Sequence, residues 1–393
     1  ERMQVTVIGA GMILHDQILP SLYHLQRTGE LGDISICARH STPLKALAGA
    51  ERLRAAFPGC SFKPFPALTE SPGKFQGDRY KDVLKRMPPG NLAVVAVPDN
   101  LHREVILEAL DRGHHVLSVK PLVLNYADAV EIEKKARAAG LLVAVEYHKR
   151  FDRRSLEARG QYRAGRFGEF KCGEARLIEP WSYRSSNFQN WFTKENTDPF
   201  TYVGCHYVDL VYFITGLRPV EVSVQGIEGK FPNGKVGWLW SNGRVKFENG
   251  GLLSVTNGLG YPDGGAGSND QCFTMFSEGK TGGATLKHDD QFRGVTHGYV
   301  EKGSDPASFR FVNPDYFRLV PWEGEGLKPV GYGYDSIEAA VRAGRTLREL
   351  GPTERRKKLA EIDAQGLLAT PANSFINELV IEAARLSIAR EGR

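Results

Sequence analysis

The chain has 393 residues, of which 41% are hydrophobic and 25% are charged, and this composition excludes a mostly disordered protein. Its length predicts two domains, each with its own core. The formal net charge of +5 comes from Lys and Arg spread along the chain, so nucleic acid is not expected as a partner. No stretch approaches eighteen consecutive apolar residues, so no membrane partner is expected either.

Five cysteines are widely spaced and form no C-x-x-C pair, which predicts free thiols in a reducing compartment. We therefore expect a cytoplasmic protein. A removed export signal stays open, because the chain begins at Glu1 instead of an initiator Met. The histidines show no metal-ligand spacing, so no metal site is expected.

The first third of the chain alternates short apolar runs with helix-like stretches, which is typical of βαβ units and a parallel sheet. Strands are expected at 5–8, 34–37 and 92–97, and the last of these is apolar enough to be buried on both faces. A helix is expected at 126–139, and further helices and strands are expected up to 145. The pattern predicts an α/β dinucleotide-binding Rossmann domain over residues 1–147.

Beyond 147 the pattern changes to period-two alternation with more aromatic residues and more glycine, which favours antiparallel strands. A helix is expected at 208–215, ended by Gly216, and the segment 282–333 is interpreted as loops and short strands. Helices return at 335–350 and 374–390. We therefore expect an α+β domain with a mostly antiparallel open sheet over residues 148–393, serving substrate binding and oligomerisation.

A glycine-rich turn follows the first strand directly. Gly9 permits a tight turn, and Gly11 lets the backbone approach a pyrophosphate at the positive end of the next helix, beside Met12. Leu14 occupies the position of the third glycine, so the fingerprint is incomplete. The alternative is an ordinary strand-to-helix turn.

The end of the second strand bears on cofactor choice. An NAD site usually has an acidic residue there for the ribose 2′-hydroxyl, but this chain has Arg39 and Ser41, which suit a 2′-phosphate. We expect NADP or NAD, with NADP slightly preferred. The alternative is that Arg39 is an ordinary surface arginine.

Several segments in order and spacing resemble the glucose-fructose oxidoreductase and inositol dehydrogenase family, known as Gfo/Idh/MocA. These segments are 97–102 (Val-Pro-Asp-Asn-Leu-His), 118–121 (Ser-Val-Lys-Pro), 147–152 (Tyr-His-Lys-Arg-Phe-Asp), 165–169 (Gly-Arg-Phe-Gly-Glu) and 204–210 (Gly-Cys-His-Tyr-Val-Asp-Leu). The resemblance covers most of the chain and is loose over 282–333. It implies the two-domain fold, a nicotinamide cofactor and a sugar or polyol substrate.

The resemblance also implies catalytic residues. Lys120 matches the lysine that lies beside the nicotinamide and the reacting hydroxyl in that family, and Val119 replaces the usual glutamate before it. His206 matches the family histidine and is expected to be the base, since imidazole titrates near neutrality. Tyr202 stands at the position of the family aspartate, so we expect it to contact substrate or relay a proton.

Other candidate contacts lie in these segments or between them. Pro98, His102 and His148 are expected at the cofactor. Candidate substrate contacts are Lys149, Arg150 and Asp209, together with the aromatic residues Trp181, Tyr183 and Trp191, whose flat faces suit sugar rings. For Asp209 the alternatives are orienting His206 or pairing with a cation, and for the tryptophans the alternative is core packing.

The predicted function is NAD(P)-dependent hydride transfer at a hydroxyl carbon of a sugar, sugar derivative or cyclitol, by a homodimer or homotetramer. Two alternatives remain open. One is an enzyme that uses bound NAD for transient oxidation while it cleaves or epimerises a glycoside. The other is a ligand-sensing homologue without catalysis, which Tyr202 in place of the aspartate makes credible.

Overall fold

The structure is a computed structural model that describes residues 1–265, 269–289, 296–301, 308–312 and 316–393. The chain forms two compact units. The first unit comprises residues 1–123, 127–148 and 316–375, and the second comprises 124–126, 149–315 and 376–393. The sequence suggested a single boundary after 147, whereas residues 316–375 return to pack with the first unit.

The first unit is built on a six-stranded parallel sheet in the order β3-β2-β1-β4-β5-β6. Its strands are β1 (Val5–Ile8), β2 (Ile34–Cys37), β3 (Lys63–Phe65), β4 (Leu92–Val95), β5 (His115–Val119) and β6 (Val143–Glu146). Strand β4 is buried along its whole length, as expected for a central parallel strand. The strand order reverses between β1 and β4, and in such sheets ligands bind outside the carboxyl ends of the strands at this point.

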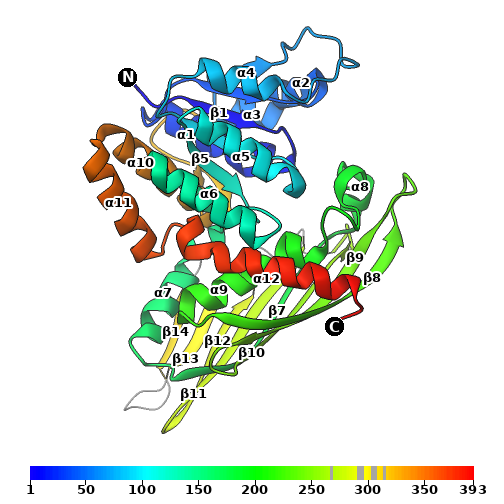
Figure 1. Cartoon of the computed structure of the whole chain (residues 1–393), viewed down its shortest axis with the longest axis vertical. Helices are drawn as coiled ribbons and strands as arrows, with labels where there is room; N and C mark the ends of the chain where they lie inside the picture. Colours follow the sequence, from blue (N-terminus) through cyan, green and yellow to red (C-terminus); the bar gives the residue numbers. More distant parts are fainter. Residues whose placement is uncertain (266–268, 290–295, 302–307, 313–315) are drawn as a thin grey trace. The chain divides into compact units, whose positions relative to one another are not determined.

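Helices cover both faces of this sheet, because right-handed crossovers that run outward in opposite directions place their helices on opposite sides. Helices α4 and α5 contact each other and the central strands, and α1 contacts α10, which lies against β6. Figure 1 shows the helices around the sheet. The helices are α1 (Leu19–Arg27), α2 (Ser41–Gly49), α3 (Glu51–Ala56), α4 (Arg79–Arg86), α5 (His102–Asp111), α6 (Tyr126–Ala139), α10 (Tyr332–Glu349) and α11 (Pro352–Gln365).

A small hairpin within 316–375 completes the first unit. Its strands β15 (Arg318–Pro321) and β16 (Leu327–Val330) pair with each other, and β16 contacts α1 and α10. The guanidinium of Arg27 fastens the hairpin, since it donates to the Glu325 carbonyl at 3.0 Å and lies 4.5 Å from the Trp322 ring centroid.

The second unit is built on an eight-stranded sheet in the order β14-β13-β12-β11-β7-β10-β9-β8. All neighbouring strands run antiparallel except β7 and β10. The strands are β7 (Glu169–Pro180), β8 (Pro219–Lys230), β9 (Val236–Phe247), β10 (Leu252–Tyr261), β11 (Asp270–Gly279), β12 (Gly282–Asp289), β13 (Thr296–Glu301) and β14 (Ser308–Val312). The expected fold class is confirmed, and the segment after 282 contributes three strands of this sheet.

Helices lie over one face of the large sheet, as Figure 1 shows for α7, α9 and α12. The helical elements of the second unit are η3 (His148–Phe151), α7 (Arg153–Arg163), η4 (Trp181–Ser185), α8 (Phe188–Trp191), the π-turn η5 (Phe200–Gly204), α9 (Cys205–Thr215) and α12 (Pro371–Ala389). Asp152 caps α7 by accepting from the Arg154 backbone N–H at 2.9 Å. Gly216 ends α9 in the left-handed conformation, with φ of +76°, which a glycine adopts without strain.

Candidate active site

The Gly9–Gly11 turn lies where β1 ends and is held between β2 and β4. The Gly9 N–H donates to the Cys37 carbonyl at 2.9 Å. With φ of +108°, a Cβ at Gly9 would lie 2.1 Å from the Ala96 carbonyl oxygen, so only glycine fits. A Cβ at Gly11, in contrast, would meet no atom of the described residues within 4 Å. The open side of the turn is therefore at Gly11.

This geometry fits a dinucleotide. The helical backbone begins directly after Gly11, so the positive end of the helix lies at this turn, where it suits a pyrophosphate. Met12 is 40% exposed beside the turn, which places an apolar side chain at the edge of this open space. Gly9, Gly11 and Met12 remain the expected cofactor contacts of the turn.

The end of β2 presents an exposed arginine. Arg39 lies over the ring of Phe75, 5.3 Å from its centroid, and the Phe75 side chain is 62% exposed. Within the described ranges Arg39 forms no ion pair, whereas the nearby Arg79 binds both carboxylate oxygens of Glu70 at 3.1 and 2.8 Å. Arg39 is therefore the cation at this strand end that remains available to an anion.

Ser41 does not fit the expected cofactor contact. Its side chain is fully buried, and its hydroxyl donates to the Glu70 carbonyl at 2.8 Å. A hydroxyl has one proton to donate, so it has none left for a phosphate. We therefore correct this expectation, and Ser41 fixes the loop after β3 instead.

Three more residues that were predicted to lie at the site follow strands β4 and β5. Pro98 and Lys120 are both partly exposed and follow β4 and β5, which are adjacent in the sheet. His102 opens α5 and is completely buried, with both ring nitrogens at hydrogen-bond distance from backbone carbonyls. A cofactor cannot reach its ring nitrogens, so His102 is corrected from a cofactor contact to a buried structural residue.

A buried carboxyl group ends β6. Glu146 is 5% exposed, and its Oε1 accepts from the Ser336 hydroxyl and from Gln17 Nε2 at 3.5 Å. Gln17 lies in the π-helical turn η1 (Leu14–Ile18) behind the glycine turn and also donates to the Gly333 carbonyl at 2.8 Å. Burial raises the pKa of Glu146 to about 7.

His148 follows directly and packs in an aromatic group of the first unit. Its ring centroid lies 5.1 Å from that of Tyr316 and 5.4 Å from that of Tyr332. The hydroxyl of Tyr316 donates to Gln17 Oε1, so this group is joined to the Glu146 network. His148 is partly exposed and remains an expected cofactor contact.

In the second unit, Arg150 and Asp209 bind each other. The guanidinium donates to both carboxylate oxygens at 2.8 and 2.6 Å, and both side chains are almost fully buried. Asn377 Nδ2 adds a third hydrogen bond to Asp209 at 2.8 Å. We expected both charged groups to contact a substrate, but each is already bound by the other in this bidentate pair. We therefore correct this expectation: Arg150 and Asp209 have a structural role and, with Asn377, connect η3, α9 and α12.

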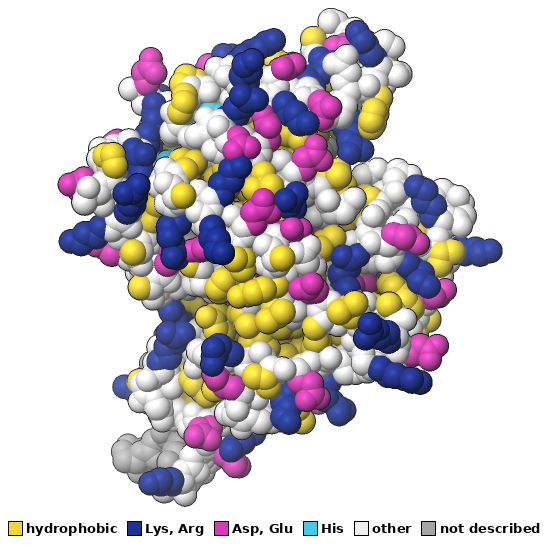
Figure 2. All heavy atoms as spheres, in the orientation of Figure 1, with side chains coloured by type: hydrophobic (Ala, Val, Ile, Leu, Met, Phe, Trp, Pro, Cys, Tyr) yellow, Lys and Arg dark blue, Asp and Glu magenta, His cyan; other side chains and the backbone are white. Residues whose placement is uncertain are grey.

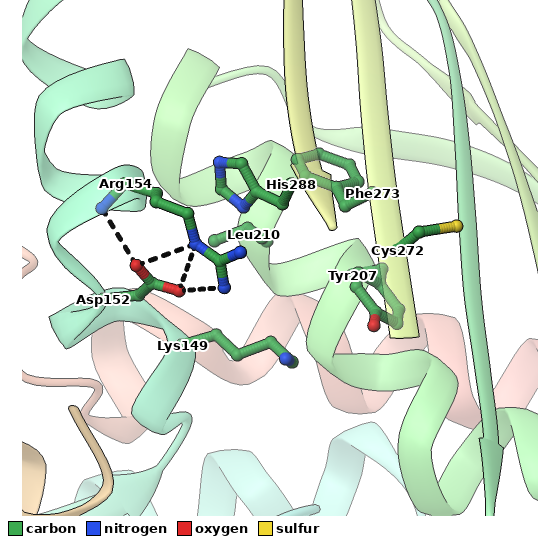
Figure 3. A pocket seen from close by; sticks show the side chains of 8 residues that line it. All are labelled: Lys149, Asp152, Arg154, Tyr207, Leu210, Cys272, Phe273 and His288. Carbon is green, nitrogen blue, oxygen red and sulfur yellow. Dashed lines mark hydrogen bonds and ion pairs between the residues drawn. The ribbon is translucent and has the colours of Figure 1, made fainter. Parts of the chain in front are cut away.

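Lys149 lines a small pocket of the second unit together with Tyr207, Phe273 and His288 (Figure 3). Its ammonium donates to Gln271 Oε1 at 2.8 Å and lies 5.5 Å from the Tyr207 ring centroid. Figure 3 also shows the buried Asp152–Arg154 ion pair at this pocket, with a shortest distance of 2.6 Å. The space has room for about one water molecule, too little for a sugar.

His206 lies in the first turn of α9 and is 3% exposed. The turn before it is anchored by Asp198, whose carboxylate accepts from the Thr201 backbone N–H at 2.9 Å and from the Thr201 hydroxyl at 2.7 Å. Burial raises the pKa of Asp198. Asp198 therefore caps the π-turn that carries Tyr202, and this anchors the backbone leading to His206.

Tyr202, Tyr183 and Trp191 share one aromatic cluster. They are partly buried and pack around Phe188 and Phe192, with the Tyr202 ring edge-on to Phe192 at 5.5 Å. Trp181 lies outside the cluster and is 53% exposed, with the Arg184 guanidinium 3.7 Å from its ring centroid. Tyr202, Tyr183 and Trp191 therefore take part in core packing. The Trp181 ring is more accessible to a ligand than these three rings are.

Figure 2 shows basic and acidic side chains interspersed over the face in view. In the ranges that the structure describes, no group of three His, Cys, Asp or Glu residues is placed to hold a metal ion. No helix in those same ranges is both long and apolar enough to cross a membrane.

Two parts of this site were not predicted from the sequence. The hydrogen bonds of the Gln17–Glu146–Ser336 network join residues 129 and 190 positions apart, with no local pattern to connect them. Phe75 lies in a polar loop, and the only local signal was an apolar side chain between Gly73 and Gly77.

The fold and the glycine turn define a dinucleotide-binding Rossmann unit followed by a mostly antiparallel sheet unit. Residues 3–147 match the model of the Gfo/Idh/MocA family, described as "Oxidoreductase family, NAD-binding Rossmann fold". The expected resemblance is thereby confirmed.

Relatives with known activities support the same class. The chain is 26% identical over 270 residues to D-glucoside 3-dehydrogenase of Escherichia coli, covering 64% of this chain and 68% of that protein. It is 30% identical over 132 residues to inositol 2-dehydrogenase 1 of Saccharopolyspora erythraea, covering 33% and 37%. An uncharacterised oxidoreductase of Schizosaccharomyces pombe is 33% identical over 99 residues, covering 25% of this chain and only 27% of that protein.

Solved structures share the fold over nearly the whole chain. Levoglucosan dehydrogenase in complex with NADH and levoglucosan superposes with a TM-score of 0.68 at 16% identity, covering 100% of this chain and 98% of that one. A 3-ketoreductase from Actinomadura kijaniata in complex with NADP superposes with a TM-score of 0.64 at 18% identity, covering 98% of both chains. At these identities the likeness concerns the fold alone.

Proposed function

We propose that this protein is an NAD(P)-dependent oxidoreductase that transfers a hydride between nicotinamide and a hydroxyl carbon of a sugar, sugar derivative or cyclitol. The observation that carries the proposal is the placement of Lys120 at the carboxyl edge of the sheet whose switch point holds the open Gly9–Gly11 turn. Ligands of such sheets bind at this edge. The relatives named as glucoside and inositol dehydrogenases support a carbohydrate or cyclitol substrate.

Two residues of the chain would transfer the hydroxyl proton and stabilise the charge on the substrate oxygen in this reaction. The nicotinamide, when bound, supplies the hydride acceptor. The Lys120 ammonium would donate a hydrogen bond to the substrate oxygen whose charge changes as the carbon–hydrogen bond breaks. His206 would take the hydroxyl proton during oxidation and return it during reduction.

Tyr202 has a narrower proposed role. Its ring is held by the aromatic cluster, so its hydroxyl would be a substrate contact or a relay donor. Trp181 is proposed as an aromatic surface for the sugar ring, since it is the most exposed of the aromatic candidates.

For the cofactor, we propose NADP slightly ahead of NAD. Arg39 supports this proposal, because it stands at the end of β2 and forms no ion pair with any described acidic residue. A guanidinium in this position suits a 2′-phosphate. The loss of Ser41 as a phosphate donor leaves Arg39 as the residue on which this preference depends.

The oligomeric state and the cellular location of the protein are also proposals. We propose a homodimer or homotetramer formed through the uncovered face of the large sheet, where Leu252 and Phe276 flank Cys172 on adjacent strands. A cytoplasmic location stays a prediction; none of the five cysteines, all of which lie within the described residues, forms a disulfide.

A second candidate is transient oxidation with retained NAD. It is favoured by a relative named 2,7-anhydro-N-acetylneuraminate hydratase in Escherichia coli, which is 28% identical over 134 residues and covers 34% of this chain and 36% of that protein. Such an enzyme would show a nicotinamide absorbance after purification and no net turnover of added cofactor.

A polyol and sugar panel followed by NADH and NADPH absorbance tests the proposal. Lys120→Met, assayed on the best substrate, should reduce turnover by roughly two to four orders of magnitude while cofactor affinity is retained. Unchanged turnover would remove Lys120 from the mechanism. Tight cofactor binding with no reduction across the whole panel would instead favour a ligand-sensing protein.

A further inference from the structure

His102 is the first residue of α5 and has no exposed surface. Its Nε2 lies 2.9 Å from the Val97 carbonyl oxygen. Its Nδ1 lies 2.6 Å from the Pro121 carbonyl oxygen and 3.1 Å from that of Leu122. The ring therefore spans the segments that follow β4 and β5.

The partners of these two nitrogens are all hydrogen-bond acceptors. Backbone carbonyls accept hydrogen bonds and cannot donate them. A neutral imidazole carries one N–H and one lone pair, so a neutral ring would place its lone pair against a carbonyl oxygen at 2.9 Å or less. Only a ring with protons on both nitrogens satisfies all three contacts.

Two other buried histidines of the first unit provide a contrast. His114 uses Nε2 for the Leu84 carbonyl at 2.8 Å, and its Nδ1 has no partner among the described residues. His115 Nδ1 accepts from the Leu142 N–H at 3.0 Å, which requires a lone pair on that nitrogen. Burial lowers the pKa of both residues, so they are neutral. His102 alone among these three lies between acceptors on both sides.

The location of the contacts gives the protonated ring a role. Lys120 immediately precedes Pro121, so the carbonyl bound by Nδ1 belongs to the residue that follows the proposed catalytic lysine. Val97 immediately precedes Pro98 at the end of β4. The ring thus joins the two strand ends that carry Pro98 and Lys120.

We propose that His102 is a buried imidazolium that holds the Lys120–Leu122 segment against the end of β4 and acts as the positioning residue for Lys120. Charge-assisted hydrogen bonds to three carbonyls offset the cost of burying the charge. The titratable side chains in the contacted segments are Asp99, in the turn before His102, and Lys120 itself. The catalytic part of this proposal rests on the proposed function, and the protonation part does not.

Nitrogen-15 NMR of the full-length protein labelled at histidine tests the protonation state without any activity assay. We expect one buried imidazole at neutral pH with protons on both ring nitrogens and slow exchange, and its signals should disappear in His102→Gln. His114 and His115 are internal controls and should each carry one ring proton. A neutral tautomer at His102 would overturn the proposal.

Kinetics test the positioning role. His102→Gln should lower kcat by about tenfold to a hundredfold, the scale expected when a reacting group is displaced by roughly 1 Å, with KM and cofactor affinity little changed. In a Lys120→Met background the same substitution should cost nothing further, because residues that act as a unit are not additive. His114→Gln is the matched control for a buried histidine and should leave kcat unchanged.

These outcomes separate the two proposals. If His102→Gln and Lys120→Met lower kcat independently, so that their effects multiply, the positioning role is refuted. If Lys120→Met has no effect while NMR shows the imidazolium, Lys120 is removed from the proposed mechanism and the protonation of His102 stands. If His102→Gln does not fold, His102→Asn and the wild-type NMR experiment still decide the protonation state.

Discussion

Replacing Glu146 by glutamine is expected to make the protein more stable above neutral pH and to leave it nearly unchanged in mild acid. Glu146 is buried at the end of β6, where its Oε1 accepts from Ser336 and Gln17. A glutamine amide has nearly the same shape as the protonated acid and keeps one oxygen for these two donors. The substitution therefore removes the ionisation and retains the contacts.

The magnitude follows from the pKa shift. Burial raises the pKa of Glu146 from 4.5 in the unfolded chain to about 7 in the folded protein. Below pH 4.5 the group is protonated in both states, so its favourable contribution is fully present. As the pH rises from 4.5 to 7, the carboxyl group ionises in the unfolded chain while the folded protein keeps its proton, so that contribution is lost progressively over this range and is fully lost above 7. At 1.36 kcal/mol per pKa unit, the full loss is about 3 kcal/mol.

Urea unfolding of the wild type and Glu146→Gln at intervals between pH 5 and 8.5 measures this effect. The difference in unfolding free energy between the two proteins should grow with pH by about 3 kcal/mol, in favour of the variant. Glu51→Gln, at an exposed position of α3, is the control for the glutamate-to-glutamine exchange itself. A pH-independent difference for Glu146→Gln would refute the reasoning.

Three further predictions concern the site. His206→Ala should lower turnover by roughly two to four orders of magnitude and remove the acidic limb from the pH profile for oxidation; a retained limb would identify another base. Arg39→Ala should weaken NADP binding by about tenfold to a hundredfold in calorimetric titration and barely affect NAD, whereas an equal loss for both would indicate contact with adenine. Asp209→Asn should destabilise the protein by about 3 to 5 kcal/mol in urea unfolding, because Arg150 is left buried without its partner. A loss below 1 kcal/mol would show that the pair is dispensable.

The sequence predicted the elements whose signals are local. Strand β4 is apolar at every position, and helix α6 coincides with its expected bounds of 126–139. Gly216 ended α9 as predicted, because a glycine can adopt the left-handed conformation at a helix end. The sequence expectation for α9 missed its first turn, since the preceding π-turn 200–204 depends on the buried cap from Asp198.

The roles of charged and polar residues were less predictable. The type and position of Arg150 and Asp209 suggested substrate contacts, but each is the other's partner across 59 residues. Ser41 stood at the right place for a phosphate, yet its single donor proton is used by a carbonyl 29 residues away. A sequence pattern shows which groups are present and does not show which acceptors they meet.

What the sequence by itself determined is therefore the order of strands and helices, the glycine turn and the family resemblance of the first 147 residues, because all of these depend on local patterns. Only the tertiary structure decided that residues 316–375 pack with the first unit and that Glu146 is buried with Ser336 and Gln17 as its hydrogen-bond donors. It also decided that His102 lies between carbonyls on both sides. The physical reason is that pKa, burial and hydrogen-bond satisfaction depend on atoms brought together from distant parts of the chain.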